Sequence, residues 1–274
     1  MLANFHTHSV FCDGKNTPEE IVISAIEKGF SAIGFSGHGY TAFDLRYCMK
    51  DVDGYTVEIG RLKEKYKREI PIYLGVEEDA FSPTDRGRFD YIIGSSHYFH
   101  VGGRYLPIDS SYDHFQKCLA AFQYDIIRLT EAYYQAFVGY IKSRKPDIIG
   151  HFDLITKFDE TDSPLFLNNA EYNRIAETYL TEAAKSGCLF EVNTGAVARG
   201  IRKTVYPSEN LLYLLKKLDV PLILSSDSHS ADTLDFGFEH HNMTCYQSHG
   251  TVNYTVDEPY TRITEYKYLT GQEK

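Results

Sequence analysis

Short apolar runs alternate with longer amphipathic segments along most of the chain. The runs contain many β-branched and aromatic side chains, which is typical of buried strands. The first is the apolar start Met1–Ala3, and the others are Ser31–Ser36, Ile72–Val76, Tyr91–Gly94, Asp147–Gly150, Leu189–Val192 and Leu222–Ser226. The pattern therefore predicts seven strands.

The segments between these runs have helical spacing and helix-boundary residues. Thr17-Pro18-Glu19-Glu20 combines a capping box with a proline in the first turn and predicts a helix as far as Gly29. A polar loop is predicted after the fourth run, as far as Asp109. The continuous pattern from Tyr112 to Ser143 is too long for an ordinary helix and predicts a bend or two helices. Further helices are predicted at Asp51–Ile70, Asn168–Ser186 and Ser208–Leu218.

Strands that alternate with helices indicate an α/β fold with a parallel sheet. Seven units fit a (β/α) barrel that lacks one unit of the usual eight. A doubly wound open sheet is the alternative, but no G-x-G-x-x-G follows the first strand. No repeat or linker divides residues 1–274, so we expect one domain with the barrel at about residues 1–238.

The tail at residues 239–274 is polar and rich in tyrosine, with a β-like pattern at Thr251–Val256. Its pattern leaves three alternatives open: the tail completes the bottom of the barrel, forms a hairpin, or makes an oligomer contact. The sequence does not determine the oligomeric state.

Composition narrows the classes of partner and the compartment. The net charge of −10 disfavours non-specific binding to nucleic acid or to an anionic membrane. The five cysteines are scattered and never spaced C-x-x-C, which indicates reduced thiols of a cytoplasmic protein. We find no signal-peptide pattern and no apolar run long enough to span a membrane.

Histidines and carboxylates follow nearly every predicted strand. Because the carboxyl ends of barrel strands meet at one rim, we expect these side chains to converge there. The candidates, from the opening H-x-H to the closing D-x-H, are His6, His8, Asp13, His38, Glu77, His97, His151, Asp227 and His229.

Imidazole and carboxylate ligands without a thiolate suit Zn, Fe or Mn. Nine ligands exceed the needs of one tetrahedral ion, and carboxylates such as Glu77 and Asp227 can bridge two metals. We therefore expect two or three divalent ions. Such clusters are suited to the hydrolysis of phosphate esters.

These motifs resemble the polymerase-and-histidinol-phosphatase (PHP) superfamily. The matching segments are His6–Ser9, Ser36–His38, Gly75–Glu77, Ser95–His97, Gly150–Asp153 and Ser225–His229. The resemblance implies a distorted (β/α)7 barrel with a trinuclear metal centre, and it implies that the nine residues above are its ligands. Asp13 stands where many members have histidine. Glu77, Asp227 and His229 are expected to be catalytic as well as ligands.

Three features resemble the histidinol-phosphatase branch: the helical stretch 112–143, the segment 150–157 and the segment 193–208. Arg199 and Arg202 follow the sixth strand, where guanidinium groups suit a phosphate. The expected substrate-binding residues are Arg199, Arg202, Lys157, Asp153 and Asn193. The alternative for the three cations is a solvated loop charge. Asp153 either faces a substrate amino group or caps a helix.

The resemblance implies a metal-dependent phosphomonoesterase, specifically an L-histidinol-phosphate phosphatase of histidine biosynthesis that acts on a small phosphorylated metabolite. Several alternatives remain open. A phosphoesterase for another small ester is one alternative, and one for nucleotides is disfavoured by the net charge and by the absence of a polymerase module. An amidohydrolase is disfavoured because the chain ends its motifs with D-x-H and offers Glu77 on the third strand. A non-catalytic metal-binding protein would require a missing ligand, and none is evident.

Overall fold

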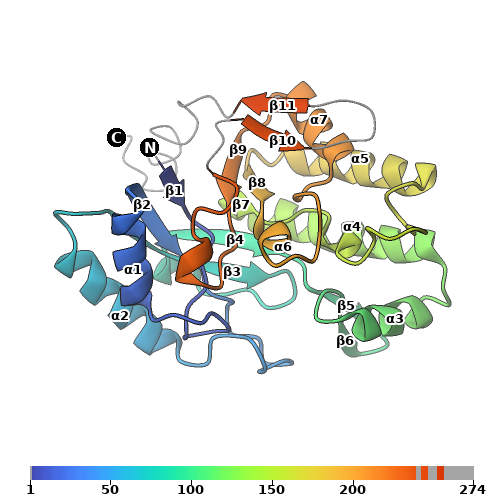
Figure 1. Cartoon of the computed structure of the whole chain (residues 1–274). Helices are drawn as coiled ribbons and strands as arrows, with labels where there is room; N and C mark the ends of the chain where they lie inside the picture. Colours follow the sequence, from blue (N-terminus) through green and yellow to red (C-terminus); the bar gives the residue numbers. More distant parts are fainter. Residues whose placement is uncertain (1, 239–241, 246–251, 256–274) are drawn as a thin grey trace.

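Seven parallel strands form one sheet in the order β1-β2-β3-β4-β7-β8-β9, which follows the order of the chain (Figure 1). The computed structural model describes residues 2–238, 242–245 and 252–255. The strands of the sheet are β1 (Leu2–Asn4), β2 (Phe30–Phe35), β3 (Ile72–Asp79), β4 (Tyr91–Ser95), β7 (Ile148–Ile149), β8 (Leu189–Asn193) and β9 (Leu222–Ser225).

The two edges of this sheet meet just beyond the ends of β1 and β9. Thr7 and Ser228 form a parallel bridge. The His8 N–H donates to the Ser228 carbonyl at 2.8 Å, and the Ser228 N–H donates to the His6 carbonyl at 3.2 Å. The sheet is therefore a nearly closed, distorted (β/α)7 barrel, as predicted, and not an open doubly wound sheet.

Helices cover the outside of this barrel. In Figure 1, α1 and α2 lie beside β2 and β3, and α4 and α5 lie on the opposite side. The helices are α1 (Pro18–Glu27), α2 (Val52–Lys65), α3 (Tyr112–Ala121), α4 (Ile126–Arg144), α5 (Ala170–Ala184), α6 (Gly195–Ala198) and α7 (Glu209–Lys217), with 3-10 turns η1 (Arg86–Arg88), η2 (Leu154–Thr156) and η3 (Ala231–Thr233). The predicted capping box at Thr17 and Glu20 is present. The long pattern is two helices, because Gln123 and Tyr124 have left-handed backbone angles (φ 57° and 59°) between them.

Successive residues of a strand belong to different apolar clusters, as the pleat requires. Leu189 in β8 and Ile223 in β9 pack inside the barrel, whereas their neighbours Phe190 and Leu224 pack against the helices. Tyr91 in β4 fills the interior, and its hydroxyl donates to the Phe5 carbonyl at 2.6 Å and to the Phe35 carbonyl at 3.1 Å. Apolar packing thus closes the barrel below its carboxyl-terminal rim.

Two regions differ from the expectations. The predicted polar loop contains a hairpin of β5 (Tyr98–Val101) and β6 (Arg104–Pro107). It forms because Gly102 and Gly103 take left-handed angles (φ 58° and 72°) at the turn, while Tyr98 and Phe99 are buried. In the tail, β10 (Asn242–Cys245) pairs antiparallel with β11 (Val252–Thr255), which is the hairpin alternative; the rest of residues 239–274 lies outside the described residues.

Candidate metal centre

Glu77 lies at the centre of the group of predicted ligands. It is 1% exposed and is surrounded by imidazole nitrogens at the rim of the barrel. Its Oε2 lies 2.8 Å from His38 Nδ1 and 3.4 Å from His6 Nε2. Its Oε1 lies 2.9 Å from His151 Nε2 and 3.3 Å from His97 Nε2. The two oxygens of one carboxylate therefore face two different sets of histidines.

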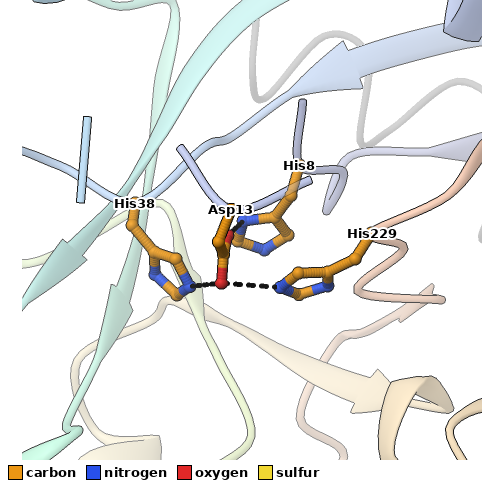
Figure 2. A group of neighbouring side chains, drawn as sticks. All are labelled: His8, Asp13, His38 and His229. Atoms are coloured by element: carbon orange, nitrogen blue, oxygen red, sulfur yellow. Dashed lines mark ion pairs between the residues drawn. The ribbon is translucent and has the colours of Figure 1, made fainter. Parts of the chain in front are cut away.

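A second group of candidate ligands surrounds Asp13, in the loop after β1. Asp13 Oδ2 lies 3.3 Å from His229 Nε2 and 3.6 Å from His38 Nε2, and Oδ1 lies 3.6 Å from His8 Nδ1. Figure 2 shows the three rings converging on this carboxylate. Burial alone would raise the pKa of Asp13, but His38, His229 and His8 lower it well below its ordinary value.

Asp227 completes the arrangement from the end of β9. Its Oδ1 lies 3.0 Å from His8 Nε2 and 3.6 Å from His6 Nε2. Its Oδ2 accepts a hydrogen bond from Arg199 Nη2 at 3.0 Å. Burial opposes ionisation, but Arg199 and then His6 hold the pKa of Asp227 well below its ordinary range. All nine predicted ligands thus lie together at one rim.

The donor set fits divalent cations. Within residues 2–238, no hydrogen-bond partner is found for the buried atoms His6 Nε2, His8 Nε2 and Glu77 Oε2, although they lie within 4.8 Å of one another. Buried polar atoms rarely stay unpaired, and a divalent cation would satisfy acceptors that converge in this way. Among the described residues, three overlapping groups have this spacing: His6, His8 and Glu77; His38, Glu77 and His97; and His8, Asp13, His38 and His229.

Two further carboxylates, which do not belong to the predicted ligands, contact the ring nitrogens of these histidines that face away from the centre. Glu191 Oε1 lies 2.5 Å from His6 Nδ1, and Asp79 Oδ2 lies 3.3 Å from His97 Nδ1. Such contacts orient a ligating imidazole and fix which nitrogen carries the proton. The signal for Glu191 is an acidic residue inside the apolar run Leu189–Val192, where only a satisfied carboxylate is tolerated.

A cavity of about 440 Å³ opens onto the metal centre. Two of the predicted substrate-binding cations line it, Arg199 and Lys157. Arg199 Nη1 lies 3.1 Å from His229 Nδ1, and Lys157 Nζ lies 3.2 Å from Asp109 Oδ2. Tyr47, Tyr98, Pro107 and Leu154 form a largely apolar part of its wall, which the sequence did not indicate.

The other three predicted substrate-binding residues do not line this cavity. Arg202 is 3% exposed and donates to the hydroxyl of Thr156 at 2.5 Å, so it is neither a phosphate clamp at the rim nor a solvated loop charge. Asp153 Oδ2 accepts hydrogen bonds from the main chain and the hydroxyl of Ser208.

Asn193 also serves the local structure. Its amide donates to Glu191 Oε2 at 2.9 Å, and its Oδ1 accepts from the Gly195 N–H at 2.9 Å. Arg202, Asp153 and Asn193 therefore stabilise the segment that follows β8, because each side chain is buried and forms hydrogen bonds within the protein.

Metal binding is expected to weaken as the pH falls. Burial lowers the pKa of His6 and of His97, but the carboxylates around them, first Glu191 for His6 and Glu77 for His97, raise both pKa values well above 6.5 in the metal-free chain. Protons therefore compete with the metal for these nitrogens around neutral pH. We expect the dissociation constant for Mn²⁺ or Zn²⁺ to rise by about tenfold for each unit that the pH falls, for each proton displaced. Calorimetric titration at several pH values measures this, and a constant affinity would contradict it.

A family model for the PHP domain matches residues 4–195. The chain belongs to the PHP domain family. In the part of this PHP domain that the structure describes, no helix is long and apolar enough to cross a membrane. A second model, UDP-galactopyranose mutase, matches residues 228–274, most of which lie outside the described ranges.

The relatives of this PHP domain belong to the histidinol-phosphatase-like branch. It is 30% identical over 252 residues to a protein of Schizosaccharomyces pombe named "Probable histidinol-phosphatase", over 84% of this chain and 81% of the relative. It is 26% identical over 261 residues to the histidinol-phosphatase of Bacillus subtilis, over 85% and 96% of the two chains.

Solved structures of similar proteins have the same fold. The HisK protein of Listeria monocytogenes matches with a TM-score of 0.72 at 21% identity, over 86% of this chain and 98% of that one. The histidinol phosphate phosphatase of Lactococcus lactis, solved with zinc, L-histidinol and phosphate, matches with a TM-score of 0.63 at 23% identity, over 84% and 86% of the two chains.

Proposed function

We propose that this PHP domain is a metal-dependent phosphomonoesterase that hydrolyses L-histidinol phosphate to L-histidinol and phosphate, as a step of histidine biosynthesis. The observation that carries the proposal is the carboxylate of Glu77, which presents each of its oxygens to a separate set of imidazoles beside a cavity. The substrate follows from the relatives, which are named for this activity.

Two or three divalent ions, Zn, Fe or Mn, are the proposed cofactors. His6, His8 and Asp227 would hold an ion with Glu77 Oε2. His97 and His151 would hold another with Glu77 Oε1, and Asp13, His38 and His229 would hold a third. When bound, such ions lower the pKa of water and neutralise charge on phosphoryl oxygens.

The chain itself supplies the charge and shape that place the substrate. Arg199 lies beside Asp227 and His229, so its guanidinium borders the place where a phosphoryl group would meet the metal ligands. Charge-assisted hydrogen bonds from such a group strengthen as negative charge develops. Lys157, paired with Asp109, lies on the same cavity.

An apolar part of the cavity wall suits the remainder of the substrate. Tyr47 and Tyr98 are stacked with their ring centroids 6.2 Å apart, and Pro107 and Leu154 add apolar surface. A wall of this kind excludes water from the flat face of an imidazole ring. We also propose a cytoplasmic location, because Cys12, Cys48, Cys118 and Cys188 are free thiols, consistent with a reducing compartment.

A panel of phosphate esters tests the substrate assignment. With Mn²⁺ added, we expect histidinol phosphate to have the highest kcat/KM among itself, an aryl phosphate, nucleoside monophosphates and a phosphodiester. The reason is that only histidinol phosphate offers both a phosphoryl dianion for the metal centre and an imidazole for the apolar wall of the cavity. The Glu77→Gln variant, purified in the same way, controls for contaminating phosphatases. A preference of about tenfold or more for a nucleotide or diester would refute the assignment and leave a metallophosphoesterase of another substrate class.

A further inference from the structure

A buried carboxylate that the proposed reaction does not use lies behind the metal centre. Glu191, in β8, is 1% exposed, and its two oxygens accept four hydrogen bonds. Oε1 accepts from His6 Nδ1 at 2.5 Å and from the hydroxyl of Ser225. Oε2 accepts from the main-chain N–H of His151 at 2.7 Å and from the amide of Asn193 at 2.9 Å. Each carboxylate oxygen of Glu191 thus accepts hydrogen bonds from two donors.

This pattern determines which nitrogen of His6 carries a proton. An ionised carboxylate only accepts hydrogen bonds, so His6 Nδ1 must be the donor in its contact with Glu191. Nε2 is then the one nitrogen of His6 that can give up its proton. It faces Glu77 Oε2 at 3.4 Å and Asp227 Oδ1 at 3.6 Å, and it has no hydrogen-bond partner in the part of the chain that the structure describes.

We propose that Glu191 is a positioning residue that keeps His6 in the tautomer with a protonated Nδ1, so that Nε2 is free to bind a divalent cation. The proposal rests on the metal centre proposed above and extends it to a residue that touches neither metal nor substrate. Glu191 also holds the main chain at His151, so one side chain positions two candidate ligands that arrive from β1 and β7. A carboxylate behind a ligating histidine commonly has this effect.

Glutamine at this position has a defined consequence, because its amide has one accepting oxygen and one donating nitrogen. If the amide nitrogen faced the His151 N–H, two donors would meet, and a main-chain N–H cannot change its role. The oxygen must therefore stay toward His151, and the nitrogen must face Ser225 and His6. The serine hydroxyl can rotate to accept. His6 accepts at Nδ1 only by moving its proton to Nε2, which removes the lone pair that would bind a metal.

Metal titration of Glu191→Gln, with ¹⁵N NMR of the histidine rings in the zinc-loaded protein, tests this inference. We expect the variant to bind one ion fewer, or to bind it about 10- to 100-fold more weakly. Its metal-free form should fold but melt below the wild type, because the amide satisfies its neighbours yet weakens the buried ion pair with His6. His6 should carry its ring proton on Nε2 in the variant and on Nδ1 in the zinc-loaded wild type.

Ser225→Ala is the matched control, because it removes a donor from the same Oε1 but leaves the tautomer of His6 unchanged. Its metal affinity should stay within about threefold of the wild type, well below the loss expected for the tautomer change. Full metal binding by Glu191→Gln, or a zinc-loaded wild type without a proton on His6 Nδ1, would overturn the inference. If Glu191→Gln does not fold, the ¹⁵N spectrum of the zinc-loaded wild type still tests whether His6 carries its proton on Nδ1. The metal titration and the NMR measurement do not use substrate. If the wild-type protein binds metal as expected but prefers another ester, only the proposed substrate is refuted and the inference about Glu191 stands.

Discussion

Replacement of Glu77 by glutamine is expected to remove at least one bound metal ion and to lower kcat by about 10³-fold or more. An amide presents one neutral acceptor where the carboxylate presents two charged oxygens, and those oxygens face His38 and His6 on one side and His151 and His97 on the other. A metal ion stabilises a phosphoryl-transfer transition state by several kcal/mol, and about 4 kcal/mol corresponds to this factor. Elemental analysis and steady-state kinetics measure the two effects, against an expected two to three ions in the wild type.

The adjacent residue offers a matched control. Glu78 lies on the opposite face of β3, is also fully buried, and pairs with Arg144 Nε at 2.7 Å. Glu78→Gln weakens this buried ion pair, so we expect it to lower stability by about 3–5 kcal/mol while metal content is kept. A Glu77→Gln enzyme with full metal content and wild-type turnover would contradict the bridging role. A loss of metal in both variants would mean that any change to β3 disturbs the centre.

Arg199→Ala is expected to lower kcat/KM, with a loss of about 2–4 kcal/mol of transition-state stabilisation, and to leave the metal content unchanged. The guanidinium lines the cavity beside Asp227 and His229, but it is not a metal ligand. Its removal therefore takes a positive charge away from the phosphoryl oxygens without removing an ion. Kinetics with histidinol phosphate, together with metal analysis, measure this.

Arg202→Ala gives the opposite pattern and serves as the comparison. Arg202 Nε lies 3.3 Å from Glu160 Oε1, and Nη1 bonds Thr156, away from the cavity. Its removal leaves the buried groups of Glu160 and Thr156 without this partner, so we expect a lower melting temperature. The kcat/KM of the folded fraction should stay close to that of the wild type. Equal losses of kcat/KM in both variants would show that the structure does not separate the two arginines by function.

The pattern of apolar runs was sufficient to predict the barrel because each run is a buried strand and each strand end meets the same rim. The same logic predicted that Glu77 and the histidines converge. It depends only on topology, which the period of the hydrophobic residues encodes.

Side-chain direction beyond the strand ends was not predictable in this way. Arg199 and Arg202 are three residues apart in one loop, and the short helix α6 with the turn after it sends one toward the cavity and the other into the core. Glu191 was overlooked for the reverse reason: it occupies a strand interior, where the pattern predicts packing. The hairpin after β4 was missed because its turn depends on Gly102 and Gly103 within a polar sequence.

The bridge between Thr7 and Ser228 has a consequence for how the molecule forms. His6 and His229 belong to one centre but are far apart in the sequence, so the seam joins the first strand of the barrel sheet to its last. Contacts of such large sequence separation form late and slowly. A nascent chain that has not yet reached β9 lacks Asp227 and therefore part of the metal centre. Ions that bind after β9 has joined the sheet would add their binding free energy to the stability of the closed barrel. Metal supply is therefore expected to raise the stability of the closed barrel, measured as its melting temperature with and without the ion.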